Sequence, residues 1–131
     1  MRTALLLTAG PLSRPNLFPM GQFNSAVGWG LNGTWAIADG KASVAASSSF
    51  MTAALNRQII IGRTYRVSCD ISDCSGGRLR FGMGSTPVYS SYNVSGNGKF
   101  TYYVTPTTGG TLVVVGAQGF TGSVDNIVIT Y

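Results

Sequence analysis

Four aspartates, Asp39, Asp70, Asp73 and Asp125, are the acidic side chains of this sequence, which contains neither glutamate nor histidine. General acid–base catalysis relies mostly on His, Glu and Asp. A hydrolase that works with two carboxylates would need two of these aspartates about 5 to 9.5 Å apart in one cleft. Serines and threonines are plentiful, but a hydroxyl nucleophile needs a general base beside it, and the sequence has no histidine for that role. The sequence therefore predicts a protein that is not an enzyme.

Two cysteines, Cys69 and Cys74, bring metal-binding or redox chemistry into consideration. A structural zinc site takes about four ligands, mostly Cys and His, which this chain cannot supply. A disulfide between residues so near in sequence would close a very short loop with little entropic gain. The Gly-rich stretch at 82–84 lacks the lysine of a phosphate-binding loop. We therefore expect free thiols, with Cys69 in the core, and no cofactor.

The net charge of +5 arises because acids are few, while the Arg and Lys residues are scattered singly along the chain. A nucleic-acid-binding protein is expected to cluster its basic residues on one face. The pattern argues against nucleic acid as a partner. It favours docking onto an acidic protein surface, because the summed charge of a protein steers association.

The first 19 residues predict an extended arm followed by a Pro-rich connector. The apolar stretch within residues 1–10 is too short for a signal peptide, which needs about 7 to 15 apolar residues. Prolines at 11, 15 and 19 forbid both a helix and a central strand. We expect the arm to contact another subunit, although a first edge strand at 3–8 fits the same residues. The assembly contacts would be Arg2, Leu5, Leu6, Leu7 and Arg14.

The rest of the chain predicts an all-β fold. Only 10% of residues are charged and 18 are glycine, a composition that disfavours helical surfaces and favours strands and turns. No apolar run approaches the roughly 20 residues of a membrane-spanning helix, so we expect a soluble protein with no membrane partner. Short runs separated by Gly-rich turns predict a sandwich or barrel. The expected strands cover residues 34–38, 41–46, 58–61, 64–72, 78–84, 99–105, 111–117 and 123–131.

Alternation within these runs predicts which side chains face the core. The expected inward rows are Tyr65, Val67, Cys69, Ile71; Leu79, Phe81, Met83; Phe100, Tyr102, Val104; Leu112, Val114, Gly116; and Ile127, Ile129, Tyr131. Asp39-Gly40 predicts a two-residue hairpin. If strands 64–72 and 78–84 pair directly through a turn at 73–77, Cys69 faces Phe81 and Asp70 faces Arg80.

Several motifs resemble those of carbohydrate-binding-module-like jelly rolls. They are NLFPMGQF at residues 16–23, GW at 28–29, GRTYRVSCDI at 62–71 and FTGSVDNI at 120–127. The resemblance implies an antiparallel β-sandwich of jelly-roll topology at residues 20–131, following the extended N-terminal arm at 1–19. It is moderately specific for the fold and poorly specific for function, because one fold hosts many roles.

The resemblance also implies two kinds of site. A structural calcium in such domains would here depend on Asp125, because Asn24 stands where an acidic ligand is common. Sugar binding would use an aromatic platform, for which the candidates are Trp35, Tyr89, Tyr92 and Tyr103. The alternative for these aromatics is packing beneath a loop, and Trp29 is expected to be structural.

Compact modules of this kind look like virion proteins of tailed bacteriophages. The resemblance implies a capsid cement or decoration protein, made in the host cytoplasm and located on the capsid surface. It would bind the major capsid protein or other virion subunits, as a homotrimer. The alternative is a carbohydrate-binding module, on a phage tail or fibre or in a secreted protein, that attaches to surface glycans.

Overall fold

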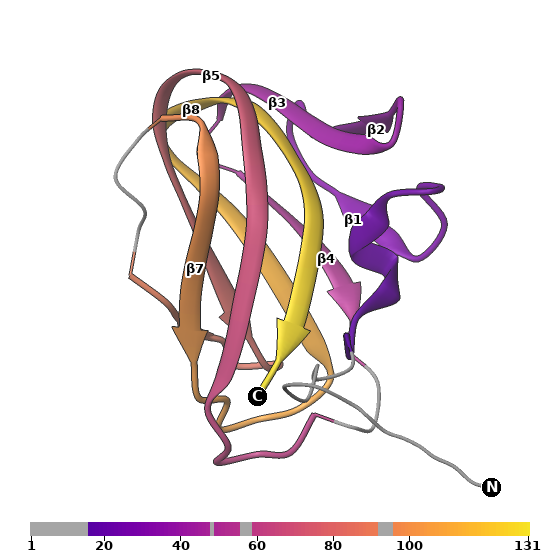
Figure 1. Cartoon of the computed structure of the whole chain (residues 1–131), viewed down its shortest axis with the longest axis vertical. Coiled ribbons are helices and arrows are strands. Elements are labelled where there is room, and N and C mark those ends of the chain that lie inside the picture. The colour runs from indigo at the N-terminus through magenta and orange to yellow at the C-terminus, as the bar shows by residue number, and fades with distance from the viewer. Residues whose placement is uncertain (1–15, 48, 56–58, 92–95) are drawn as a thin grey trace, which may run out of the picture.

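The computed structural model describes residues 16–47, 49–55, 59–91 and 96–131, most of which lie in β-strands (Figure 1). A short 3-10 helix, η2 (Pro19–Gln22), precedes the strands β1 (Trp29–Leu31), β2 (Ala36–Ala38), β3 (Lys41–Ser47), β4 (Phe50–Ala54), β5 (Tyr65–Met83), β6 (Val88–Tyr89), β7 (Gly98–Val104) and β8 (Thr111–Thr130). The predicted arm contacts Arg2, Leu5, Leu6, Leu7 and Arg14, and the platform candidate Tyr92, lie outside the described ranges.

Two long strands, β5 and β8, pair with each other along most of their length. The first half of β5 pairs with the second half of β8, as in Val67 opposite Ile129. The second half of β5 pairs with the first half of β8, as in Phe81 opposite Val114. Figure 1 shows both strands bending over at the top of the view, so that each belongs to two layers of sheet.

The two layers form the predicted antiparallel β-sandwich. One layer has the strand order β7–β5–β8–β3–β2, and the other has the order β6–β5–β8–β4–β1. Because the same two strands run through both layers, the sheet is nearly closed into a barrel. The fold is therefore all-β, of the jelly-roll class.

The bend depends on residues with a left-handed backbone. They are Asp73 (φ 55°) and Gly77 (φ 78°) in β5, and Gln118 (φ 56°) and Gly119 (φ 74°) in β8. A Cβ on Gly77 would overlap the backbone N and Cα atoms of Phe120. Glycine therefore lets the two strands cross in contact at the bend, where their pairing register also shifts.

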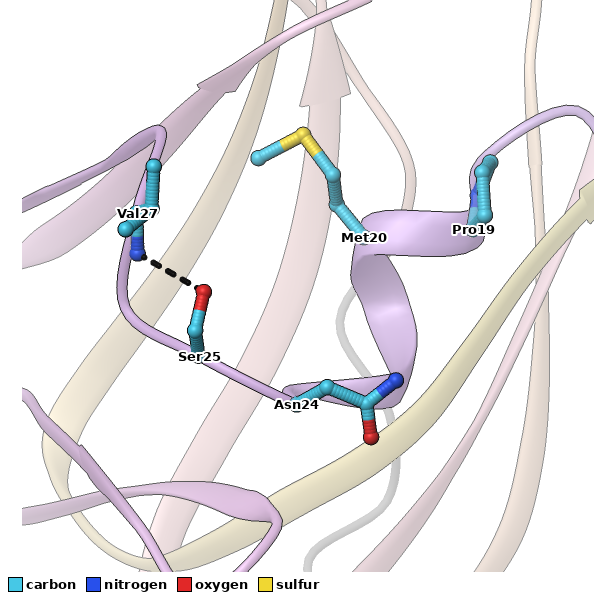
Figure 2. A pocket seen from close by; sticks show the side chains of 5 residues that line it. All are labelled: Pro19, Met20, Asn24, Ser25 and Val27. Carbon is cyan, nitrogen blue, oxygen red and sulfur yellow. Dashed lines mark hydrogen bonds between the residues drawn. The ribbon is translucent and has the colours of Figure 1, made fainter.

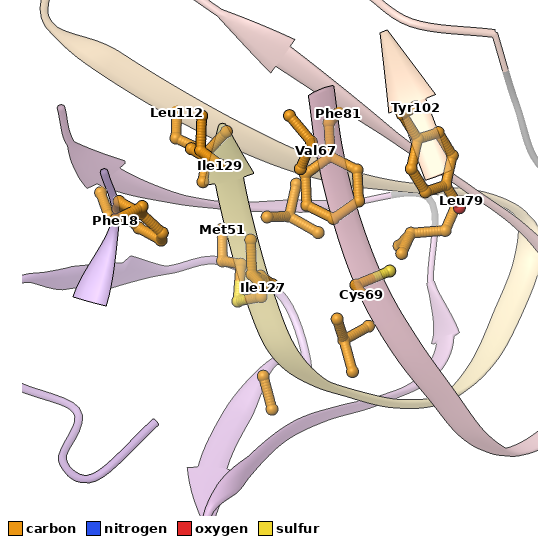
Figure 3. Close-up of a cluster of buried hydrophobic side chains, with 14 of the residues drawn as sticks. Phe18, Met51, Val67, Cys69, Leu79, Phe81, Tyr102, Leu112, Ile127 and Ile129 are labelled. Atoms are coloured by element: carbon orange, nitrogen blue, oxygen red, sulfur yellow. The ribbon is translucent and has the colours of Figure 1, made fainter. Parts of the chain in front are cut away.

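The core lies between the layers and contains most of the side chains that alternation turns inward (Figure 3). Tyr65, Val67, Cys69, Leu79, Phe81 and Met83 are fully buried, as predicted. Trp29 is also buried, stacked on Phe23 at 5.0 Å between ring centroids, which confirms its structural role. One inward prediction is wrong: Tyr131 lies beyond the end of β8 and is 46% exposed.

The residues just before η2 are held against β8. The backbone N–H of Leu17 donates to the Ile129 carbonyl at 2.9 Å, and the Ile129 N–H donates to the Asn16 side-chain oxygen at 3.1 Å. Leu17 and Phe18 are buried in the core. The described part of the predicted connector therefore packs as part of the sandwich.

Strand pairing differs from the prediction in the centre of the chain. The Asp39-Gly40 hairpin is confirmed, since Ala38 pairs with Lys41. The direct pairing of 64–72 with 78–84 is wrong, because both runs belong to β5 and pair with β8. Asp70 therefore lies opposite Lys99 and Asp125 rather than Arg80.

Other short segments also depart from the predicted strands, which did not include β1 (Trp29–Leu31) or β6 (Val88–Tyr89). Residues 59–61 are not in a strand, because the chain enters a turn there, in which the Arg63 N–H donates to the Ile60 carbonyl at 3.3 Å. The Ala-rich segment after Ser49 forms β4, which alternation alone did not single out. The formation of β4 places Phe50 on a sheet face.

Candidate functional site

The surroundings of Asp125 do not fit the calcium site that the resemblance implies. Its Oδ1 accepts a hydrogen bond from the neighbouring Asn126 N–H at 2.6 Å. The acid opposite it, Asp70, is already paired with Lys99 at 3.0 Å. Calcium takes six to eight oxygen ligands, and the described residues contain no group of three or more His, Cys, Asp or Glu placed to hold a metal.

Asn24, the second residue of that implied site, lines a different hollow (Figure 2). Its other lining residues are Pro19, Met20, Ser25 and Val27, and the hollow measures about 270 Å³. Figure 2 shows the Met20 thioether reaching toward Val27. This side chain passes over Gly28, where an added Cβ would lie 2.6 Å from the Met20 methyl carbon. The hollow is apolar on this side and carries no acid among its lining residues.

Trp35 does not belong to a sugar-binding platform. The side chain is only 4% exposed, with its ring stacked over Phe120 at 6.4 Å between centroids. Its indole N–H donates to the Ser49 carbonyl at 3.3 Å. The platform prediction for this residue is therefore wrong and the alternative, packing, holds, because the bend in β8 brings Phe120 beneath the ring and makes it part of the core.

Tyr89 lies on the outer face of the β6–β5–β8–β4–β1 layer and is 40% exposed. Its ring covers Gly82, where an added Cβ would be 2.7 Å from the ring carbons. The Arg80 guanidinium lies 4.1 Å from the ring centroid. Glycine at position 82 therefore lets the ring lie flat on the sheet, with a cation packed on it.

The same outer face continues across β8 to β4. Val115 pairs with both Arg80 and Phe50, and Val113 pairs with both Gly82 and Thr52. Phe50 is 44% exposed, whereas Val113 is only 5% exposed. We call Phe50, Val113, Val115, Arg80 and Tyr89 the aromatic face. An antiparallel sheet usually turns polar residues to solvent, so this composition sets the face apart.

Tyr103 lies on the other layer, as the prediction for an outward platform residue requires, and is 64% exposed. It pairs with Arg66 of β5, which in turn pairs with Thr130 of β8. Together with Thr64 and Tyr131, Tyr103 and Arg66 line a groove of about 220 Å³. We call these four residues the tyrosine groove.

The outer face around the tyrosine groove is polar. Every second residue of a strand lies on the same face. Beside the Arg66–Tyr103 pair, the next pairs of β5 and β7 on this face are therefore Ser68 with Thr101 and Asp70 with Lys99. The structure therefore separates the platform candidates: Tyr89 is on the aromatic face and Tyr103 in the groove. Sequence reasoning missed Phe50 and Tyr131, whose exposure depends on strand pairing and on where β8 ends.

Two buried groups beneath these surfaces have perturbed acidity. Burial, and then the charge of Asp70, raises the pKa of the Cys69 thiol from 9.0 to about 12. Burial also raises the pKa of Tyr102, and the adjacent Cys69 adds to the effect. Both groups are thus neutral in the folded protein near pH 7, and the two cysteines are free, as predicted.

We expect the folded state to lose stability in alkali. The Cys69 pKa is higher in the folded chain than its ordinary 9.0, so its contribution is complete below that pH and declines as pH rises toward about 12. The slope from one such group is at most about 1.4 kcal/mol per pH unit. Urea unfolding across this range measures it, and Cys69→Val should flatten the profile. Identical profiles for the two proteins would contradict the assignment.

Comparisons with known proteins leave the fold and these two surfaces as the basis for function. No protein-family model matches the chain, and no curated protein matches it. In the part of the chain that the structure describes, no helix is long and apolar enough to span a membrane.

Proposed function

We propose that this chain is a non-enzymatic structural protein of a tailed-bacteriophage virion, which binds neighbouring capsid subunits as a cement or decoration protein. The resemblance of the motifs at residues 16–23 and 120–127 to those of carbohydrate-binding-module-like jelly rolls supports this class of protein. The aromatic face supplies the surface on which such binding would depend. The homotrimer and the contacts of the N-terminal arm belong to the same proposal.

The observation that carries the proposal is the apolar character of an outward sheet face. Phe50 and Tyr89 are both exposed by about two fifths, at 44% and 40%, on a face whose centre is valine. Contiguous exposed apolar patches are uncommon on monomeric proteins and often mark interaction sites. Tyrosine and arginine, which here stack on one another, are also enriched at protein interfaces.

The charge of the chain fits an acidic partner surface. The net charge is +5, and the ion pairs of the described residues, Lys41–Asp73 and Lys99–Asp70, use lysines. Arg80 lies on the Tyr89 ring, within the aromatic face. An acidic subunit would meet this guanidinium at the rim of an apolar contact, where charge favours association and orientation.

Rebinding to virions that have been depleted of the protein tests the proposal. We expect Phe50→Asp to weaken the affinity for depleted virions at least about tenfold, because a central aromatic contact is worth about 2 kcal/mol or more. The bound copy number should fall accordingly. The matched control is Thr101→Asp, an exposed strand residue on the other layer, which should rebind normally. Equal rebinding of both variants, with unchanged melting of the isolated proteins, would reject the aromatic face as the docking surface.

A second candidate function, glycan binding, is favoured by the tyrosine groove. The rings of Tyr103 and Tyr131 are both accessible in a groove open to solvent. Aromatic rings combine a large apolar area with a polar end, which suits the alternating faces and hydroxyls of a sugar. Glycan binding by the isolated protein, lost in Tyr103→Ala, would support this function.

A further inference from the structure

We infer that the tyrosine groove binds a carboxylated sugar residue, with Arg66 of the groove and the neighbouring Arg63 holding the carboxylate. This inference rests on the second candidate function and adds the class of ligand. It begins from the geometry of the groove, because Arg66 of β5 pairs with Tyr103 of β7 on one side and with Thr130 of β8, the residue before Tyr131, on the other. A cation placed among aromatic walls is suited to an anionic ligand that also has an apolar surface.

The positive charge at the groove is larger than its lining suggests. The Arg63 guanidinium carbon lies 4.7 Å from the centroid of the Tyr131 ring, so a second cation borders the same wall. Neither Arg63 nor Arg66 forms an ion pair with any acid that the structure describes. The acid two rows along β5, Asp70, is paired with Lys99. An incoming carboxylate would therefore meet two guanidinium groups that no aspartate side chain engages.

Hydroxyl groups at the groove suit a sugar better than a peptide side chain. The hydroxyls of Thr64 and Thr105 lie 2.6 Å apart and hydrogen bond to each other at its border. Each hydroxyl has one hydrogen and two lone pairs, so the pair retains capacity for sugar hydroxyls. The ring of Tyr103, which is 64% exposed, offers a flat surface to the C–H face of a pyranose, while Arg63 packs on the ring of Tyr131. The groove of about 220 Å³ is smaller than the usual drug-sized pocket, which matches a single sugar residue.

The combination of charge and flat apolar surface separates this ligand from its alternatives. A neutral sugar would use the tyrosines and threonines but leave both arginines without a partner. An acidic peptide would use the arginines but gain little from two accessible rings and a hydroxyl pair. The carboxylate of a uronic acid sits on the ring itself, so one sugar residue can reach both kinds of group.

Binding of three polymers to the full chain tests the inference: polygalacturonate, neutral dextran and polyglutamate. We expect polygalacturonate to bind most tightly, and its affinity to fall with added salt because the contact is charged. Arg66→Gln should weaken this binding at least about tenfold, the cost of one charge-assisted hydrogen bond. Arg78→Gln is the matched control, since Arg78 is also an exposed β5 arginine but lies beyond the bend.

The three polymers distinguish failure of the inference from failure of glycan binding itself. Equal binding of dextran and polygalacturonate, sensitive to Tyr103→Ala but not to Arg66→Gln, would overturn the carboxylate and keep a glycan site. Tighter binding of polyglutamate would overturn the sugar in favour of an acidic peptide. No binding to any polymer would overturn both the inference and the glycan function.

Discussion

Replacing Gly77 by alanine is expected to destabilise the protein by about 3 kcal/mol or more, a large part of the stability of an ordinary domain. The residue has φ 78°, which alanine adopts only with strain. An added Cβ would also overlap the backbone of Phe120, which cannot move aside like the end of a flexible side chain. The midpoint of chemical unfolding measures the change.

Two other glycines provide controls that separate strain from overlap. Gly76 lies next to Gly77 and has nothing within 4 Å of an added Cβ, so Gly76→Ala should change stability by no more than about 0.5 kcal/mol. Gly40 also has open space but a φ of 77°, so Gly40→Ala should cost about 1 kcal/mol from strain alone. If Gly77→Ala proved as stable as Gly76→Ala, the two strands would not cross at this point.

Replacing Trp35 by alanine is expected to cost about 3 to 5 kcal/mol, the range for a large aromatic residue removed from a core. The ring is buried and stacked over Phe120, and its N–H is bonded to the Ser49 carbonyl. The variant should lose stability without a specific loss of glycan binding in the protein that remains folded. Thermal unfolding and polysaccharide binding, measured on the same samples, give the two quantities.

Tyr103→Ala is the matched comparison for that experiment. Its side chain is 64% exposed, so we expect stability to change by no more than about 0.5 kcal/mol while binding at the tyrosine groove is lost. The reverse pattern, with binding lost in Trp35→Ala and kept in Tyr103→Ala, would return Trp35 to the platform. Alternation predicts that Tyr103 points outward, whereas the burial of Trp35 is known only from the structure.

Alternation along a strand predicts most of the side chains that face the core. Val67, Cys69 and Phe81 lie inward because a pleated strand directs successive side chains to opposite faces, whatever strand pairs beside it. The same rule is wrong for Tyr131, since this residue follows the last residue of β8. Where the ladder ends, the pleat no longer determines the direction of a side chain.

Strand pairing could not be predicted because it depends on residues far apart in the sequence. The Gly-rich run at 73–77 fits a hairpin turn, yet its positive φ values at Asp73 and Gly77 also fit a bulged bend within one strand. The choice between them is made by β8, which pairs with both halves of β5. Without that pairing, the two long strands look like four short ones.

The candidate surfaces could be predicted only in part, for the same reason. Tyr103 is outward in its own strand, and this prediction is confirmed. Phe50 belongs to the aromatic face because β4 pairs with the first half of β8. Trp35 is buried because the bend of β8 brings Phe120 beneath it. In both cases a distant strand determines whether an aromatic side chain is accessible.

Cryo-EM of purified virions tests most directly whether this chain is a virion protein that docks through its aromatic face. We predict regular density for the sandwich on the capsid surface, with β4, β5 and β8 of the aromatic face against capsid subunits and the tyrosine groove turned outward. Absence of the chain from the capsid, or capsid density in which Phe50 and Tyr89 face solvent, would contradict the proposal.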